Sequence, residues 1–225
     1  MANQYVEKIL QRITENTNTT TNVGIIIASP SETPPYKYHW IRDSALVMRT
    51  IVDMYRKTKD PIYFQSILNY IENESKLQKL ETISGLGEPK YNINCTAFNG
   101  SWGRPQNDGP ALRGIILFQI IELFSYKYET IIQQLILPII IRDLEYLLNN
   151  YRKVCFDIWE EKKGWHFYTR MVQTKFLKEA LRYKKLIQGN IDIELMNTTY
   201  QSLLNDLKDH INGDTIISSF DENGK

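Results

Sequence analysis

The stretch with the clearest capacity for chemistry runs from Phe156 to Glu161 and places three carboxylates around one tryptophan. The carboxylates are Asp157, Glu160 and Glu161, and the tryptophan is Trp159. A carboxyl group pressed against an indole loses hydration, which disfavours its charged form and lets it hold a proton near neutral pH. This pattern therefore predicts a general acid.

The same acids also fit a structural role. Asp and Glu just before a helical run cap its N-terminus and complement the helix dipole. Aromatic residues around this stretch favour a sugar-binding cleft instead, because pyranose rings bury their apolar faces on aromatic side chains. They are Trp159, Trp165, Phe167 and Tyr168. Both readings stay open at this point.

The composition limits the partners of the chain. Its 225 residues form one large domain or a piece of a bigger one, and 42% hydrophobic and 24% charged residues are ordinary for a globular protein. The net charge of +1 gives no long-range field, so we expect neither nucleic acid nor a membrane as partner. The most apolar stretch, 135–141, is too short to cross a bilayer. No signal peptide follows Met1, which predicts a cytoplasmic or intracellular protein.

The two cysteines give no sign of a disulfide framework or a metal site. Cys95 and Cys155 lie far apart in the sequence and match no metal-ligand spacing. We expect both to be free, buried thiols, because free cysteine is among the most buried residue types. Neither a metal nor a cofactor is expected.

Apolar residues recur at helical spacing along most of the chain. An Asn/Thr run over 14–22 ends the first predicted helix, and Val23–Ala28 suits a short strand. Pro61 suits the first position of a helix, and Pro138 predicts a kink. Helices are expected over residues 4–14, 40–57, 61–80, 110–124, 130–150, 165–187 and 196–211.

The order of these elements predicts an α/α toroid. Three helical hairpins each follow a polar, aromatic loop, at 29–43, 84–109 and 151–165. In such a toroid inner helices line a barrel and outer helices cover it, so the loops before the inner helices reach the same end. The helix over 110–124 is apolar on nearly all sides and should be buried all round. One cleft would then hold Arg42, Asp43, Trp102, Arg104, Glu160 and Glu161.

Three segments carry a resemblance to a known family. Residues 28–46 read ASPSETPPYKYHWIRDSAL, residues 85–113 read GLGEPKYNINCTAFNGSWGRPQNDGPALR, and residues 156–161 read FDIWEE. In this order and spacing they closely resemble the glucoamylases of glycoside hydrolase family 15, especially the fungal and yeast type. The resemblance implies an (α/α)6 barrel and inverting release of glucose from the non-reducing ends of starch-like α-glucans.

The resemblance also implies roles for individual residues. Glu160 looks like the general acid that protonates the glycosidic oxygen. Arg42 and Asp43 look like the pair that grips the terminal glucose hydroxyls by charge-assisted hydrogen bonds. From the residues alone, a helix-terminal salt bridge is the favoured explanation of this pair. Aromatic walls would come from Tyr36, Trp40 and Trp102, and support for the adjacent sugar or the loop from Asp157 and Glu161, beside Trp159.

Two departures from the family stand out. Cys95 occupies the place of an acidic residue before Thr96, and it cannot support the same charge network. The general base that an inverting glycosidase needs lies, in the family, in the second half of the barrel. The resemblance therefore implies that residues 1–225 are an incomplete, N-terminal half barrel. The alternative is a truncated, inactive fragment that at most binds a glucan. The helix over 110–124 would then expose apolar flanks and favour self-association.

Overall fold

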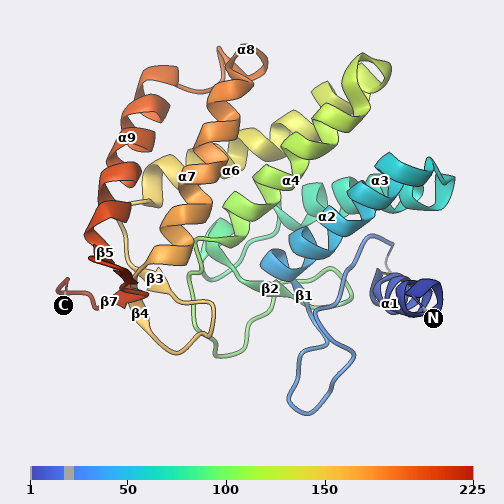
Figure 1. Cartoon of the computed structure of the whole chain (residues 1–225), viewed down its shortest axis with the longest axis horizontal. Helices are drawn as coiled ribbons and strands as arrows, with labels where there is room; N and C mark the ends of the chain where they lie inside the picture. The colour runs from blue at the N-terminus through green and yellow to red at the C-terminus, as the bar shows by residue number, and fades with distance from the viewer. Residues whose placement is uncertain (1, 18–22, 225) are drawn as a thin grey trace. The chain divides into compact units, whose positions relative to one another are not determined.

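The computed structural model describes residues 2–17 and 23–224 and is built mainly from helices (Figure 1). The chain divides into two compact units. The first contains Met1–Glu81 and Lys90–Phe98, and the second contains Thr82–Pro89 and Asn99–Lys225. No helix among the described residues is both long and apolar enough to cross a membrane. The expected all-α class is confirmed.

The first unit is organised around the helix pair α2 (Ile41–Thr58) and α3 (Pro61–Leu77), as the periodicity predicts. The turn between them is specified locally. Lys59 takes a left-handed conformation that ends α2, and the Asp60 side chain caps α3 by accepting from the Ile62 N–H. Helix α1 spans Ala2–Thr17, and 18–22 of the predicted Asn/Thr run lie outside the described residues.

Two short strands precede and follow this helix pair in sequence. Strands β1 (His39–Trp40) and β2 (Lys90–Tyr91) pair antiparallel, with Trp40 opposite Lys90. The strand predicted over Val23–Ala28 is reduced to a single bridge between Ile27 and His39. The loop that leads into α2 is thereby tied to two other segments of this unit.

The second unit contains the remaining helices. The predicted kink near Pro138 takes another form, because a π-helical turn precedes α6 and Pro138 lies in its first turn, where no N–H is needed. The helices are α4 (Gly109–Phe124), α5 (Glu129–Ile131), α6 (Leu137–Asn150), α7 (Phe167–Arg182), α8 (Lys184–Ile187) and α9 (Ile193–Asp209). Short turns form at Gly85–Gly87 (η1), Ser125–Tyr128 (η2) and Ile132–Ile136 (η3).

Short strands flank α7 and α9, and they replace the predicted helix only at residues 165–166 and 211. Strands β3 (Cys155–Phe156), β4 (Lys163–His166) and β7 (Ser219–Phe220) form one antiparallel sheet in the order β3-β4-β7. A second hairpin joins β5 (Ile211–Asn212) to β6 (Thr215–Ile216). The predicted helix starts too early, because Trp165 pairs with Phe220, a partner 55 residues away that no local pattern reveals.

Helix α4 is the core of the second unit. Its apolar side chains are buried, apart from Leu123, which is half-buried near the end of the helix. Gly114 permits the contact with α7, because a Cβ there would lie 2.1 Å from the Phe176 ring. Burial is confirmed for most of the helix, although Glu122 is exposed and Gln119 and Leu123 are half-buried. The expected broad exposure of its apolar flanks is wrong.

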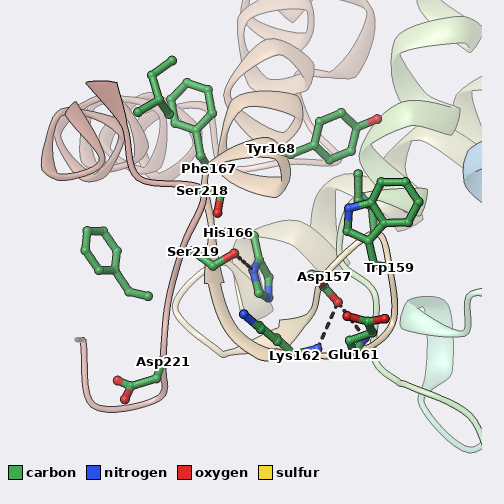
Figure 2. A pocket seen from close by; sticks show the side chains of 13 residues that line it. Asp157, Trp159, Glu161, Lys162, His166, Phe167, Tyr168, Ser218, Ser219 and Asp221 are labelled. Atoms are coloured by element: carbon green, nitrogen blue, oxygen red, sulfur yellow. Dashed lines mark hydrogen bonds between the residues drawn. The ribbon is translucent and has the colours of Figure 1, made fainter. Parts of the chain in front are cut away.

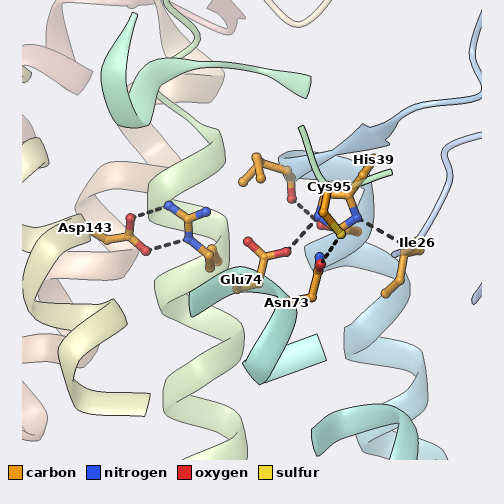
Figure 3. Close-up of polar contacts among 9 residues, drawn as sticks. Ile26, His39, Asn73, Glu74, Cys95 and Asp143 are labelled. Carbon is orange, nitrogen blue, oxygen red and sulfur yellow. Dashed lines mark hydrogen bonds and ion pairs between the residues drawn. The ribbon is translucent and has the colours of Figure 1, made fainter. Parts of the chain in front are cut away.

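A buried ion pair joins α4 to α6 (Figure 3). Arg113 donates from Nε to Asp143 Oδ2 at 2.8 Å and from Nη2 to Oδ1 at 2.6 Å. Both side chains are at most 1% exposed. A charge this deeply buried is tolerated because both oxygens of its partner are engaged in the fork geometry of the guanidinium.

We predict that Arg113→Met lowers the free energy of unfolding by about 3–5 kcal/mol, because it leaves the Asp143 carboxylate buried without its guanidinium. Urea unfolding measures this loss. Arg56→Met is the matched control, since the Arg56–Asp53 pair on α2 is nearly half exposed and should contribute at most about 1 kcal/mol. Equal losses in the two variants would contradict the prediction.

Candidate active site

The carboxylate-rich stretch forms the loop of the β3–β4 hairpin. The Asp157 N–H donates to the Lys162 carbonyl at 2.9 Å, and the Glu160 N–H donates to the Asp157 carbonyl at 3.0 Å. The Asp157 side chain closes the loop from inside, because its Oδ1 accepts from the N–H groups of Glu161 (2.8 Å) and Lys162 (3.1 Å) (Figure 2). Asp157 is thus a structural residue of the loop.

Glu160 has an unusual backbone conformation. Its φ of +64° lies in the left-handed region, which favours glycine and costs other residues about 1–2 kcal/mol. Residues are held in such conformations when the surrounding structure determines them strongly, and they cluster at functional sites. The loop therefore keeps a carboxylate at a position where the backbone alone would prefer glycine.

The Glu160 side chain is held by a buried glutamine. Gln106 is 2% exposed, and its Nε2 donates to Glu160 Oε1 at 3.0 Å and to the Gly103 carbonyl at 3.1 Å. The Phe156 N–H donates to the Pro105 carbonyl at 2.9 Å. A Cβ on Gly103 would lie 2.9 Å from the Phe156 ring and 3.0 Å from the Glu160 carbonyl oxygen. Segment 103–106 is therefore pressed directly against the hairpin.

Arg104, which lies in the same segment, holds the surrounding loop together through its contacts. Its Nε and Nη2 lie 3.0 and 2.9 Å from Glu88 Oε1, and its Nη1 donates to the Gly100 carbonyl at 2.9 Å. Ser84 donates to the other Glu88 oxygen at 3.1 Å. These contacts close the long loop on itself. Trp102 lies half-buried within the loop that they hold.

The structure contradicts the physical reason that the sequence offers for a general acid. The indole of Trp159 is 75% exposed, and Glu161 is exposed as well. A side chain so open to solvent removes little water from neighbouring carboxylates. Glu160 is instead half-buried and bonded to Gln106, a residue that the sequence reasoning missed although it lies within the quoted GSWGRPQNDGPALR segment.

A cavity of about 640 Å3 opens beside this loop (Figure 2). This volume is within the range of small-molecule sites. Loop and hairpin residues form one side of the cavity, and the C-terminal segment 216–221 forms the other. This second wall was not predicted from the sequence. The side chains on the loop side include Asp157, Trp159, Glu161, Lys162, Phe167 and Tyr168.

Two histidines hold the C-terminal wall in place. His166 Nε2 donates to the Cys155 carbonyl at 2.9 Å, so its Nδ1 accepts from the Ser219 hydroxyl at 2.8 Å. His210 Nδ1 donates to the Ile217 carbonyl at 2.7 Å. Its Nε2 then accepts from Arg170 Nη1 at 3.1 Å, which requires the neutral imidazole.

The surroundings of His210 disfavour its protonation. Burial lowers the pKa of His210, and the Arg170 cation lowers it further, while the Ile217 carbonyl and Asp209 act in the opposite direction. Arg170 stacks on Trp165 at 4.9 Å. The charged and titratable groups around this imidazole are Arg170 on α7, Asp206 and Asp209 on α9, and His166 on β4.

The candidate sugar-gripping residues lie in the first unit. Trp40 is 3% exposed, whereas Tyr36 is exposed. Arg42 Nε lies 3.9 Å from Asp43 Oδ2, which is a loose ion pair within the first turn of α2. The buried Lys90 ammonium lies 4.8 Å from the Trp40 ring, and 4.3 Å from each of the Tyr38 and Phe98 rings. These cation–π contacts hold Trp40 rigidly.

A buried histidine fixes the loop before α2 (Figure 3). His39 Nδ1 accepts from the Ile26 N–H at 3.0 Å, so Nε2 donates to Glu74 Oε1 at 2.7 Å. Both side chains are fully buried. The Cys95 thiol donates to Asn73 Oδ1 at 3.2 Å in the same region. The backbone just before Trp40 and Arg42 is therefore held in place by the hydrogen bonds of His39.

Both cysteines are free thiols, as expected. Cys155 is buried, and burial raises its pKa to about 11, so it stays protonated. Cys95 is only half-buried, so the expectation of full burial is wrong for this residue. Burial also raises the pKa of Cys95. Neither thiol has the lowered pKa of a nucleophile.

The residues that the sequence assigns to one cleft are divided between the units. Trp102, Glu160 and Glu161 belong to the second unit. Trp102 directly precedes segment 103–106, which is hydrogen-bonded to the Glu160 loop. Arg42 and Asp43 belong to the first unit. Their meeting with Glu160 in one cleft stays a prediction.

Comparisons with known proteins give a consistent result. The profile described as Glycosyl hydrolases family 15 matches residues 2–225. A protein of Schizosaccharomyces pombe described as a probable glucoamylase is 37% identical over 198 residues, which cover 83% of this chain and 43% of the relative. The Saccharomycopsis fibuligera glucoamylase structure superposes with a TM-score of 0.85 at 30% identity, over 93% of this chain and 50% of the other.

The glycoside hydrolase family 15 glucoamylase from Hypocrea jecorina superposes more closely, with a TM-score of 0.89 at 31% identity. The superposition covers 98% of this chain and 40% of the H. jecorina chain. The fold class is therefore that of the (α/α)6 glucoamylases. The chain spans about half the length of these proteins or less.

We predict that the free energy of unfolding falls as the pH drops from 7.5 to 5.5, because His210 is held neutral. The unfolded chain takes up this proton near pH 6.5, whereas the folded chain does so at a lower pH. The contribution of neutral His210 to the free energy of unfolding is thus fully present above pH 6.5. It is lost as the pH falls toward the pKa of His210 in the folded chain.

Urea unfolding at the two pH values tests this prediction. His210→Gln is the control, because it keeps an amide donor and acceptor but cannot titrate. The fall should be smaller in the variant than in the natural chain. An equal fall in both would show that other groups cause the pH dependence.

Proposed function

We propose, because the chain belongs to glycosyl hydrolase family 15, that it is the N-terminal, acid-bearing part of the catalytic domain of a glucan 1,4-α-glucosidase. The reaction is hydrolysis of glucose units from the non-reducing ends of starch- or glycogen-type α-glucans, with inversion. No cofactor takes part in this chemistry.

Glu160 is the general acid of the proposed reaction. Its O–H bond breaks as the proton passes to the glycosidic oxygen, and the bond from that oxygen to C1 breaks with it. A water molecule attacks C1 from the opposite face and gives its proton to a general base. Glu160 must therefore hold one oxygen at a fixed place relative to the scissile bond.

The hydrogen bond from Gln106 to Glu160 carries this proposal. Among the acids of the loop, Asp157 uses its carboxylate to bind the loop backbone, and Glu161 is exposed. Glu160 combines a half-buried side chain, a fixed hydrogen-bond donor and a backbone conformation that only the folded loop sustains. Pre-organisation of this kind is what general-acid catalysis requires.

The proposed substrate contacts extend from this acid. Arg42 and Asp43 bind hydroxyl groups of the terminal glucose, with Tyr36, Trp40 and Trp102 as apolar walls. The rigid mounting of Trp40 over Lys90 supports such a wall. Glu161 and Trp159 line the cavity beside the loop and contact the next sugar, while Asp157 maintains the loop.

The general base is assigned to sequence outside residues 1–225 or to a partner. An inverting enzyme places its base about 6.5–9.5 Å from the acid. Of the nearby carboxylates, Asp157 binds loop N–H groups and Glu88 binds Arg104 and Ser84. The chain also covers less than half of the S. pombe relative. The second candidate function is glucan binding without hydrolysis by an inactive fragment.

Self-association through an exposed half-barrel surface stays a prediction, but other side chains than those of α4 would have to make the contact. Helix α4 supplies little of such an apolar contact, because nearly all of its apolar side chains are buried. The exposed apolar side chains on the neighbouring helices are Met171 on α7 and Leu195 on α9, each more than 40% exposed. Sedimentation of the chain tests this expectation. An intracellular location also stays a prediction.

We predict that residues 1–225 alone release glucose from maltoheptaose at least about 1,000-fold more slowly than a complete glucoamylase, since the base is absent. Glucose release measures this rate. Robust turnover that Glu160→Gln abolishes would place a base within this chain. Asp221→Asn would then test the carboxylate that lines the cavity from the C-terminal side.

We predict that maltotriose binding weakens about 10- to 100-fold in Arg42→Ala, because a hydrogen bond to a charged group contributes roughly 1.5–3 kcal/mol. Titration calorimetry measures the affinity. Arg56→Ala is the matched control, since Arg56 lies in the last turn of the same helix and pairs with Asp53. Equal affinities for the natural chain and Arg42→Ala would remove Arg42 from the site.

A further inference from the structure

The Gln106 amide can adopt only one orientation. Its Nε2 faces two acceptors, the Gly103 carbonyl at 3.1 Å and Glu160 Oε1 at 3.0 Å. If the amide were flipped, its carbonyl oxygen would face both of these oxygens and both hydrogen bonds would be lost. The two N–H groups of one nitrogen are thus divided between the backbone and the acid.

The backbone of Gln106 fixes the position of this donor. The Gln106 N–H donates to the Gly87 carbonyl at 2.9 Å, and the preceding Pro105 carbonyl accepts from Phe156 at the start of the hairpin. The side chain is 2% exposed, so water does not compete for its N–H groups. An amide also does not titrate, so the donor remains a donor at every pH at which the chain is folded.

This geometry distinguishes the two oxygens of Glu160. A proton on Oε1 would leave a hydroxyl oxygen, a weaker acceptor than a carbonyl oxygen, to accept from the Gln106 N–H. A proton on Oε2 leaves Oε1 as a carbonyl oxygen, which still accepts the hydrogen bond. The hydrogen bond from Gln106 therefore favours the protonated form in which Oε2 carries the proton.

We propose that Gln106 is a positioning residue that holds Glu160 Oε1 as an acceptor and so assigns the transferable proton to Glu160 Oε2. The inference rests on the proposed function only in calling this proton transferable. Gln106 touches neither substrate nor reacting atoms in this role. It decides which oxygen of the acid faces the scissile bond in its protonated form.

Carbon-13 NMR titration of the Glu160 side-chain carboxyl in the full chain tests the proposal. Gln106→Met keeps the size of the side chain but removes the donor. Loss of a hydrogen bond to the carboxylate should raise the midpoint of the Glu160 titration by about 1 pH unit. Gln173→Met is the matched control, because Gln173 is 3% exposed and donates to the Asn107 carbonyl, not to Glu160. It should leave the midpoint unchanged.

The side-chain amide signals of Gln106 report the position of the proton. In the natural chain, these signals should remain protected from solvent exchange below the Glu160 midpoint, because Oε1 still accepts. Loss of this protection on protonation would place the proton on Oε1 and overturn the proposal. An unchanged midpoint in folded Gln106→Met would overturn it as well.

A second variant keeps the test decisive if Gln106→Met does not fold. Gln106→Glu preserves the shape of the side chain and brings a second carboxylate within hydrogen-bond distance, so the two must share a proton and the midpoint should rise further. No rise would overturn the proposal. Because the titration needs no sugar, a failure to bind maltotriose would count against the proposed function and leave this result standing.

Discussion

The structure of the candidate site depends on the close approach of segment 103–106 to the β3–β4 hairpin. Gly103 leaves room for the Phe156 ring, and the Pro105 carbonyl binds the hairpin backbone. Gln106 then meets Glu160 at hydrogen-bond distance. A side chain at position 103 would come within 3.0 Å of the Phe156 ring and the Glu160 carbonyl oxygen, so one of the two segments would have to shift. The approach of segment 103–106 to the hairpin thus places the Gln106 donor beside the Glu160 carboxylate.

The remaining elements support this contact from behind. The long loop that contains 103–106 is closed by the Arg104–Glu88 ion pair, and it leads into α4, the buried core of its unit. The hairpin leads into α7, and β7 completes its sheet. Buried polar groups therefore lie at the ends of helices that apolar packing has already positioned. This arrangement holds the Glu160 and Gln106 side chains in fixed positions.

The sequence predicted most helices, because helical periodicity and capping residues leave local signals. The capped turn around Pro61 and the apolar circumference of α4 can be read within one segment. The pairing of Trp165 with Phe220 cannot, since a short ladder has no period and its partner lies far along the chain. The exposure of Trp159 and the contact of Gln106 with Glu160 depend on how two loops meet, so no local pattern reveals them. The role of Glu160 as general acid stays a prediction.

The central claim is that a glucan end binds beside the pre-organised pair of Glu160 and Gln106. The most direct test is an NMR titration of the isotope-labelled full chain with maltotriose. We predict shifts of the Gln106 side-chain amide and the Glu160 carboxyl signals that saturate together with those of the 157–162 loop. Saturable binding that moves signals elsewhere and leaves these groups unchanged would contradict the account.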